Sequence, residues 1–168
     1  MDFDPVLLKL DKLISMSRLK DIAFIVDIDI GLRISKMASA IGQLRAGAYL
    51  LGSGPSTVGI IPLSVDEIML GRSSTILEEP VETLIDYTIS DTTYFTPREV
   101  SRVHAKIVRE NDEEGAAFYI VDLGSTFGTY VNHDKIHKDE KSKLLGHGDI
   151  ISLGPSMVST YMFYLKEQ

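Results

Sequence analysis

Hydrophobic and polar residues alternate in short segments over most of this 168-residue chain, and glycine, proline, serine and charged residues separate the segments. Successive side chains of a strand point to opposite faces, so an apolar residue at every second position indicates a strand with one buried face. From residue 48 onward the pattern predicts a mainly β fold, an antiparallel β-sandwich of short strands joined by turns. The predicted strands are residues 49–51, 58–63, 68–70, 85–89, 103–108, 117–122, 130–132, 149–153 and 161–165.

The beginning of the chain follows other periods. Apolar residues recur every three or four positions in residues 5–14, and Asp4 followed by Pro5 is typical of a helix start, so a short amphipathic helix is predicted there. Residues 24–34 carry an apolar side chain at every second position. A helix would scatter these side chains around its circumference, so this stretch predicts a strand.

A second helix is predicted after Ser35, because serine is a favourable residue at a helix start. Its predicted buried face consists of Ile34, Met37, Ala38, Ile41 and Leu44, and the helix would end at Gly47. Residues 1–46 are therefore expected to form a helix–strand–helix accessory extension to a sandwich in residues 47–168. Because an isolated strand is marginal in water, the extension is expected to pack on the sandwich or on a second copy, which would make a homo-oligomer.

The charge balance bears on the kind of partner. The chain carries a net charge of −7, whereas nucleic-acid-binding proteins need a basic surface, so neither DNA nor RNA is expected to bind. Residues 1–46 contain seven Lys and Arg against six Asp and Glu, and residues 47–168 contain ten against eighteen. An anion site in the acidic part therefore needs a local basic cluster. The residues that could supply it are Arg72, Arg98, Arg102, Lys106 and Arg109.

Composition excludes several other classes. The absence of cysteine rules out a disulfide framework, a thiolate metal site and a cysteine nucleophile. The four histidines have no carboxylate partners at informative spacing, so no metal, no cofactor and no enzymatic activity are expected. No run of 18 apolar residues occurs and the first residues are acidic, so neither a membrane segment nor a secretory signal is predicted. We expect a cytoplasmic protein.

Three short motifs carry candidate chemistry. The apolar segment 68–70 leads into Gly71 and Arg72, and arginine suits a bidentate grip on phosphate oxygens, although this pair alone also fits an ordinary strand end. In the second motif, Ser101 precedes a segment whose alternation places His104 on the polar face. Such a histidine is more often a structural residue, hydrogen-bonded to hold a loop, than a catalytic base.

The third motif connects two apolar segments through serine, threonine and glycine. Its residues are Gly124, Ser125, Thr126, Phe127, Gly128 and Thr129. The glycines allow the positive φ angles of a tight turn, and exposed backbone amides of such a turn can face an anion. A plain hairpin would show the same composition, so this motif indicates an anion site only in combination with the other two motifs.

In this order, the three motifs resemble the forkhead-associated (FHA) domain, a β-sandwich that reads phosphothreonine, over about residues 47–168. The resemblance implies the following phosphopeptide contacts: Arg72, Ser101, Arg102, Thr126 and Phe127. It implies that three further residues structure the loops: Gly71, His104 and Gly128. A small pocket for the γ-methyl group would then favour phosphothreonine over phosphoserine.

The chain departs from the family pattern in two places. Phe127 stands where the family often has an asparagine that binds the peptide backbone, which changes how residues beside the phosphothreonine would be read. In addition, 28 residues separate Arg72 from Ser101, and the surplus falls in residues 73–82 and 91–98. Both insertions would border the binding end.

These observations predict a non-enzymatic adaptor or regulatory scaffold whose partner is a threonine-phosphorylated protein. A different class of function stays open: an FHA-like sandwich that no longer binds phosphate and serves as a structural or oligomerisation module. Three features favour that alternative: Phe127, the acidic insertion in residues 73–82 and the apolar extension in residues 1–46. Phosphorylated and unphosphorylated threonine peptides distinguish the two.

Overall fold

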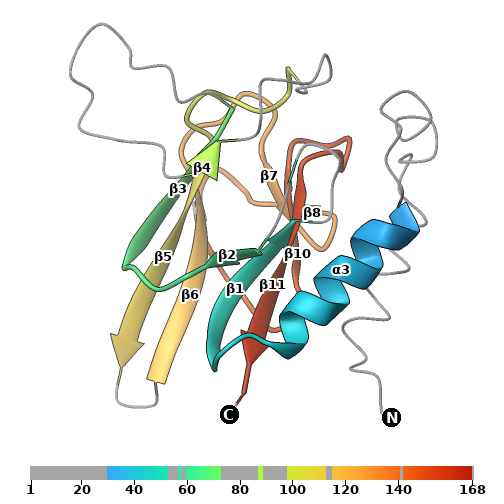
Figure 1. Ribbon diagram of the computed structural model, residues 1–168. Helices are drawn as coiled ribbons and strands as arrows, with labels where there is room; N and C mark the ends of the chain where they lie inside the picture. The colour runs from blue at the N-terminus through green and yellow to red at the C-terminus, as the bar shows by residue number, and fades with distance from the viewer. Residues whose placement is uncertain are drawn as a thin grey trace, which may run out of the picture.

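The computed structural model describes residues 30–52, 57, 60–72, 87–88, 98–112, 115–140 and 142–167. These residues form a helix followed by a series of strands (Figure 1). The elements are α3 (Ile30–Gly42), β1 (Gly47–Gly52), β2 (Ile60–Pro62), β3 (Glu67–Gly71), β4 (Tyr87–Thr88), β5 (Ala105–Asp112), β6 (Gly115–Asp122), β7 (Thr129–Val131), β8 (Asp134–Lys135), β9 (Ser142–Leu144), β10 (Ile150–Leu153) and β11 (Thr160–Lys166).

The strands form two sheets that face each other. One has the order β2-β1-β11-β10-β7-β8 and the other β4-β3-β5-β6-β9. Among the described strands, neighbours pair antiparallel except for β3 and β4, which run parallel. The predicted mainly β, antiparallel sandwich is therefore confirmed. Strands β8 and β9 were not predicted, because these short segments are mostly polar and show no alternation of apolar and polar residues.

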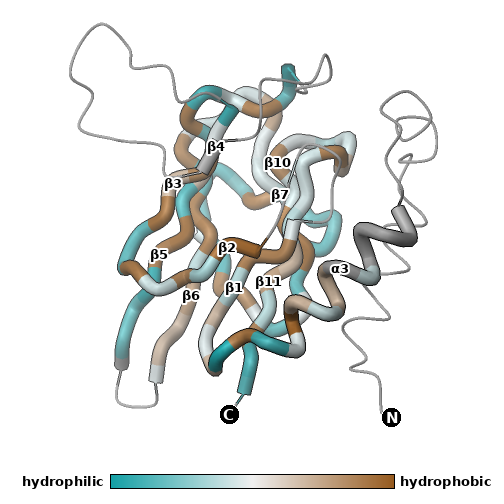
Figure 2. The backbone as a smooth tube through the Cα atoms, in the orientation of Figure 1, coloured by the Kyte–Doolittle hydropathy of each residue, from teal (hydrophilic) through white to brown (hydrophobic). Residues whose placement is uncertain are grey.

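The inner faces of both sheets form the main hydrophobic core. Leu50 of β1, Ile120 of β6 and Phe163 of β11 are completely buried in it, and the rings of Phe118 and Phe163 lie 5.4 Å apart across the two sheets. Figure 2 shows the hydrophobic segments mainly on the strands. Burial of these side chains from water supplies most of the favourable free energy of folding.

The larger sheet is also covered on its outer face, where α3 packs. Met37 and Ile41 of the helix contact a second buried cluster that includes Leu51, Met162 and Tyr164. Strands β10 and β11 consequently contain consecutive buried residues instead of alternating ones, as expected of a sheet with both faces covered. Within the described residues, no helix is long and apolar enough to cross a membrane.

Two predictions for the extension are wrong. The predicted strand 24–34 ends inside α3, which begins at Ile30 and not after Ser35, and the helix ends at Gly42 rather than at Gly47. Residues 24–29 and the predicted helix 5–14 lie outside the described residues. The apolar positions 30, 34, 37 and 41 also follow a helical spacing, and packing on the sheet favours the helix. Ala38, predicted to face inward, is exposed.

Strand register brings three connections together at one end of the sandwich. Leu70, near the end of β3, pairs with Ala105, where β5 begins, and Ala105 pairs with Asp122, where β6 ends. The segments after β3, before β5 and after β6 therefore leave the sheet side by side. Strand β5 starts two residues later than predicted, so residues 101–104 belong to the connection. Of the two insertions, residues 73–82 and 91–97 lie outside the described residues, and Arg98 is described.

Candidate functional site

Arg72 follows β3 directly and is fixed by the segment before β5. Its backbone N–H donates to the carbonyl of Ser101 at 3.0 Å, and its Nε donates to the carbonyl of Val100 at 3.0 Å. Val100 is completely buried, so it anchors this segment in the core. Within the described part of the chain the terminal guanidinium nitrogens have no carboxylate partner. They are thus positioned and still able to bind an anion.

Ser101 and Thr126 come from different connections and are directly bonded. The backbone N–H of Thr126 donates to Ser101 Oγ at 3.2 Å. Because this bond uses Ser101 Oγ as an acceptor, the hydroxyl hydrogen is left to donate elsewhere. The hydroxyl of Thr126 is on an exposed residue beside it. The structure therefore brings together Arg72, Ser101 and Thr126, three of the five residues for which a phosphopeptide contact was predicted.

The His104 ring forms hydrogen bonds to the same two connections, the segment before β5 and the segment between β6 and β7. The Ser101 backbone N–H donates to His104 Nδ1 at 3.0 Å, so the ring hydrogen is on Nε2, which lies 3.2 Å from the carbonyl of Gly128. The alternation had predicted that His104 lies on the polar face of a strand, but the residue is completely buried. Burial lowers the pKa of His104, and this outweighs the opposite effects of the Gly128 carbonyl and the Asp122 charge. A neutral ring is what this geometry requires.

The connection between β6 and β7, residues 123–128, is organised by Asp122. The carboxylate accepts hydrogen bonds from the backbone of Gly124 (2.9 Å) and Ser125 (3.0 Å), and from the hydroxyls of Ser125 and Thr129 (2.6 Å each). Partial burial raises the pKa of Asp122, but these bonds lower it more, so the pKa lies below its usual value. Ser125 Oγ in turn accepts from the backbone of Gly128 at 3.0 Å.

Asp122 and Thr129 were not among the predicted site residues. The sequence does contain a signal, because an aspartate two residues before a glycine is typical of a turn in which the carboxylate binds following backbone amides. Gly128 lies in this turn with φ of 92°, a conformation that favours glycine. Gly71 is buried at the end of β3, opposite Thr88 in the register. Phe127 is 46% exposed at the tip.

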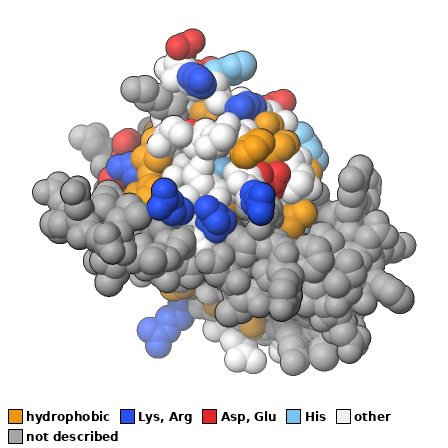
Figure 3. All heavy atoms as spheres, turned by 90° about the horizontal axis from the view of Figure 1, so that it is seen from above, with side chains coloured by type: hydrophobic (Ala, Val, Ile, Leu, Met, Phe, Trp, Pro, Cys, Tyr) orange, Lys and Arg blue, Asp and Glu red, His pale blue; other side chains and the backbone are white. Residues whose placement is uncertain are grey.

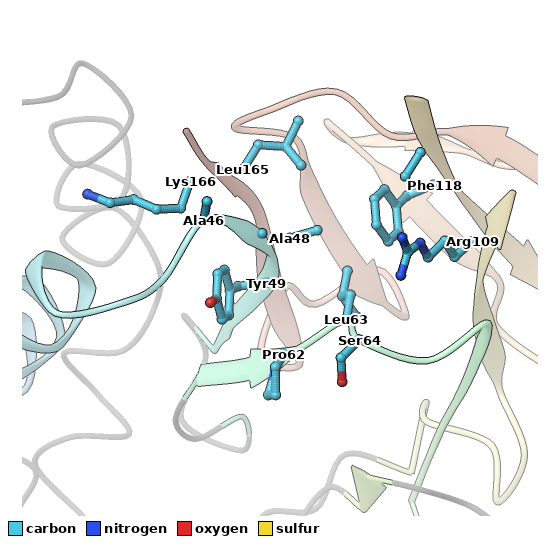
Figure 4. A pocket seen from close by; sticks show the side chains of 12 residues that line it. Ala46, Ala48, Tyr49, Pro62, Leu63, Ser64, Arg109, Phe118, Leu165 and Lys166 are labelled. Carbon is cyan, nitrogen blue, oxygen red and sulfur yellow. The ribbon is translucent and has the colours of Figure 1, made fainter. Parts of the chain in front are cut away.

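The predicted basic cluster is only partly brought together. Arg98 and Arg102 are exposed in the segment before β5, and Arg72 donates hydrogen bonds to the Val100 and Ser101 carbonyls of this segment. Figure 3 shows several Lys and Arg side chains on the described surface seen from this end. Lys106 instead forms an ion pair with Glu67 at 2.6 Å. Arg109 lines a pocket of about 420 Å³ with Phe118, farther along the sandwich (Figure 4). Arg109 therefore lies apart from the other residues of the predicted cluster, and the charge of Lys106 is paired with an acid.

Across the described ranges, no group of three or more His, Asp or Glu residues is arranged to hold a metal ion. The site is built from an arginine, hydroxyls and backbone amides, which are the groups that bind a phosphate ester without a metal.

Comparison with known proteins identifies the chain's relatives. The family model "FHA domain" matches residues 68–154. Protein FraH of Nostoc sp. is 44% identical over 66 residues, which are 39% of this chain and 21% of FraH, so the match spans about a fifth of that relative.

Solved structures show the same fold. The FHA domain of the CT664 protein from Chlamydia trachomatis is 22% identical and covers 71% of this chain and 98% of its own, with a TM-score of 0.53. The MEK1 FHA domain in complex with a HOP1 phosphothreonine peptide is 24% identical and covers 73% and 100%, with a TM-score of 0.50.

Proposed function

The chain belongs to the FHA domain family, and from this premise we propose that it is a non-enzymatic module that binds protein partners through phosphothreonine. Domains of this family are phosphothreonine-dependent interaction modules rather than enzymes. The observation that supports the proposal most directly is the mutual bonding of the three loop segments. Arg72 is bonded to Ser101, Ser101 to Thr126, and His104 to both Ser101 and Gly128.

The proposed roles follow from this geometry. The guanidinium of Arg72 would bind two phosphate oxygens, while the hydroxyls of Ser101 and Thr126 would each donate one hydrogen bond. Arg102, exposed beside them, would add charge. A hydrogen bond to a charged group contributes about 1.5–3 kcal/mol, and a micromolar complex needs about 8 kcal/mol. A few such bonds and modest contacts with the flanking peptide are sufficient for reversible binding.

We further propose that the binding module spans residues 47–168 and that residues 1–46 are an accessory extension. Its described part, α3, packs on the outer face of the larger sheet through Met37 and Ile41, away from the inner core. A cytoplasmic adaptor or regulatory scaffold is the role we infer, with a threonine-phosphorylated protein as the partner and no nucleic acid or membrane involved.

The test is a titration of fluorescent peptides in phosphothreonine, phosphoserine and unmodified forms. The phosphothreonine form should bind and the unmodified form should not. Arg72→Ala should weaken binding more than tenfold, because losing a bidentate contact with a dianion costs at least about 2 kcal/mol. Arg109→Ala removes the same charge at a position outside the site and serves as the control. Equal binding of phosphorylated and unmodified peptides would support the structural or oligomerisation module instead.

A further inference from the structure

A groove runs beside the proposed phosphate site, on the far side of residues 123–128. It has a volume of about 920 Å³, and its walls are residues 121–126 and 128 on one side and residues 135–138 on the other. The second wall consists of the end of β8 and the segment that follows it. We call this depression the Lys135 groove.

Lys135 lies directly against the proposed phosphate loop. A Cβ atom at Gly128 would be 2.2 Å from Cε and 2.9 Å from Nζ of Lys135, so the lysine stem crosses the open face of that glycine. The Lys135 ammonium is also 5.9 Å from the centre of the Tyr130 ring, close enough for a weak cation–π contact. Because Gly128 has no side chain, the Lys135 ammonium can lie against the backbone of Gly128, a residue two positions after Thr126.

The cations of the groove are not neutralised by neighbouring acids. Neither Lys135 nor Lys138 forms an ion pair with any residue in the described ranges, and His137 lies between them on the same wall. The acid on the opposite wall, Asp122, already accepts four hydrogen bonds from its own turn. Three further acids next to this segment do not line the groove: Asp134, Asp139 and Glu140. Two lysines against the single carboxylate of Asp122 leave the groove lining with a net positive charge, in a chain whose net charge is −7.

We propose that the Lys135 groove binds an Asp or Glu side chain that lies near the phosphothreonine in the partner's sequence. The inference rests on the proposed function and specifies the substrate class of that site. Gly128 is two residues from Thr126, so their Cα atoms are at most about 7 Å apart. An extended peptide advances about 3.3 Å per residue. An acidic residue within about three positions of the phosphothreonine can therefore reach the Lys135 ammonium.

The experiment compares phosphothreonine peptides that carry Asp, Gln or phosphoserine at each position from three before to three after the phosphothreonine. The protein variant is Lys135→Met with Lys138→Gln, because methionine keeps the apolar stem over Gly128 and removes the charge. The control is Lys143→Gln with Lys166→Gln, in β9 and at the end of β11, which removes the same two charges outside the groove.

The parent protein should bind the best Asp peptide about two- to fivefold more tightly than its Gln counterpart, as expected for exposed ion pairs. The Lys135→Met with Lys138→Gln variant should lose this ratio and keep its affinity for the Gln peptide within about twofold of the control variant, while the control variant keeps the ratio. A parent that binds phosphothreonine peptides without preferring Asp at any position would overturn the groove and leave the proposed function intact. A preference for phosphoserine alone would show that the groove binds a second phosphate and would overturn the proposal that it binds a carboxylate. Failure of every phosphorylated peptide to bind would overturn both proposals.

Discussion

Replacing His104 by alanine tests whether one buried ring holds the proposed phosphate site together. The ring accepts a hydrogen bond from the Ser101 backbone through Nδ1 and donates one to the Gly128 carbonyl through Nε2. Both partners belong to segments that carry proposed phosphate contacts. Alanine would leave the two backbone groups without these partners and remove a side chain that is completely buried.

The expected loss can be worked out from those contacts. A buried polar group left without a partner costs about 1–3 kcal/mol. Ser101 is half-buried, so water can partly replace the ring there, and the two losses together should amount to about 3 kcal/mol. In a domain whose total stability is about 5–15 kcal/mol, His104→Ala should still fold. It should lower the melting temperature by about 6–12 °C at this chain length.

Urea unfolding followed by circular dichroism measures this difference, and peptide titration of the same samples measures the site. His104→Asn should destabilise the protein less than His104→Ala, because the amide oxygen can accept from the Ser101 backbone as Nδ1 does. His137→Ala, an exposed histidine, should change the stability by less than about 0.5 kcal/mol. If His104→Ala were as stable as the parent and bound phosphopeptide equally well, the ring would not be what holds the two segments.

The lowered pKa of His104 adds a pH dependence with a definite sign. Below its ordinary value of 6.5 the unfolded chain binds a proton that the folded ring does not accept until a lower pH. The contribution of His104 to stability is therefore fully present above pH 6.5 and is lost as the pH falls through the folded-state pKa. His104→Asn should remove this dependence in that range, and unfolding curves from pH 7 downward would show it.

Three further changes test the surrounding structure. Asp122→Asn should cost about 1–2 kcal/mol near pH 7 in urea unfolding; because the folded-state pKa of Asp122 is lowered, the parent should lose this advantage as the pH falls below 3.8. Met37→Ala should destabilise the protein by about 2 kcal/mol if α3 packs on the sheet, whereas Ala38→Ser, at an exposed position, should not. Gly128→Ala should weaken phosphopeptide binding, because φ of 92° strains alanine and the Lys135 stem must move.

The sequence predicted most strands, because their apolar positions have a period of two that no helix shares. Residues 30–34 show the limit of this reasoning, since a short apolar run can satisfy both periods at once. Whether residues 30–34 form a helix or a strand depends on how they pack on the outer face of the larger sheet. That face includes residues of β1, β10 and β11, and the last two strands lie more than a hundred residues later in the chain. Local pattern contains no information about that contact.

The basic residues show a second limit. Alternation places Arg102 and Lys106 on one face of a strand and Arg109 on the other, and each face extends from one end of the sandwich to the other. Arg109 is four residues beyond the start of β5, or about 13 Å at 3.3 Å per residue. It therefore cannot share a small anion site with the residues before that strand. Strand rise could have excluded Arg109, whereas the ion pair of Lys106 with Glu67 depends on cross-strand register.

The meeting of the three motifs, by contrast, follows from strand lengths that can be read along the chain. Strands β5 and β6 have eight residues each and are joined by residues 113–114, so the chain returns after β6 to the end where β5 began. The charged, glycine-containing stretch 109–115 marks that turn in the sequence. The Ser101 segment before β5 and the Thr126 segment after β6 must then adjoin, and pairing of β3 with β5 adds Arg72 at the same edge. The spacing of the motifs, more than any single residue in them, is what converts an arginine, a serine and a threonine into one candidate anion site.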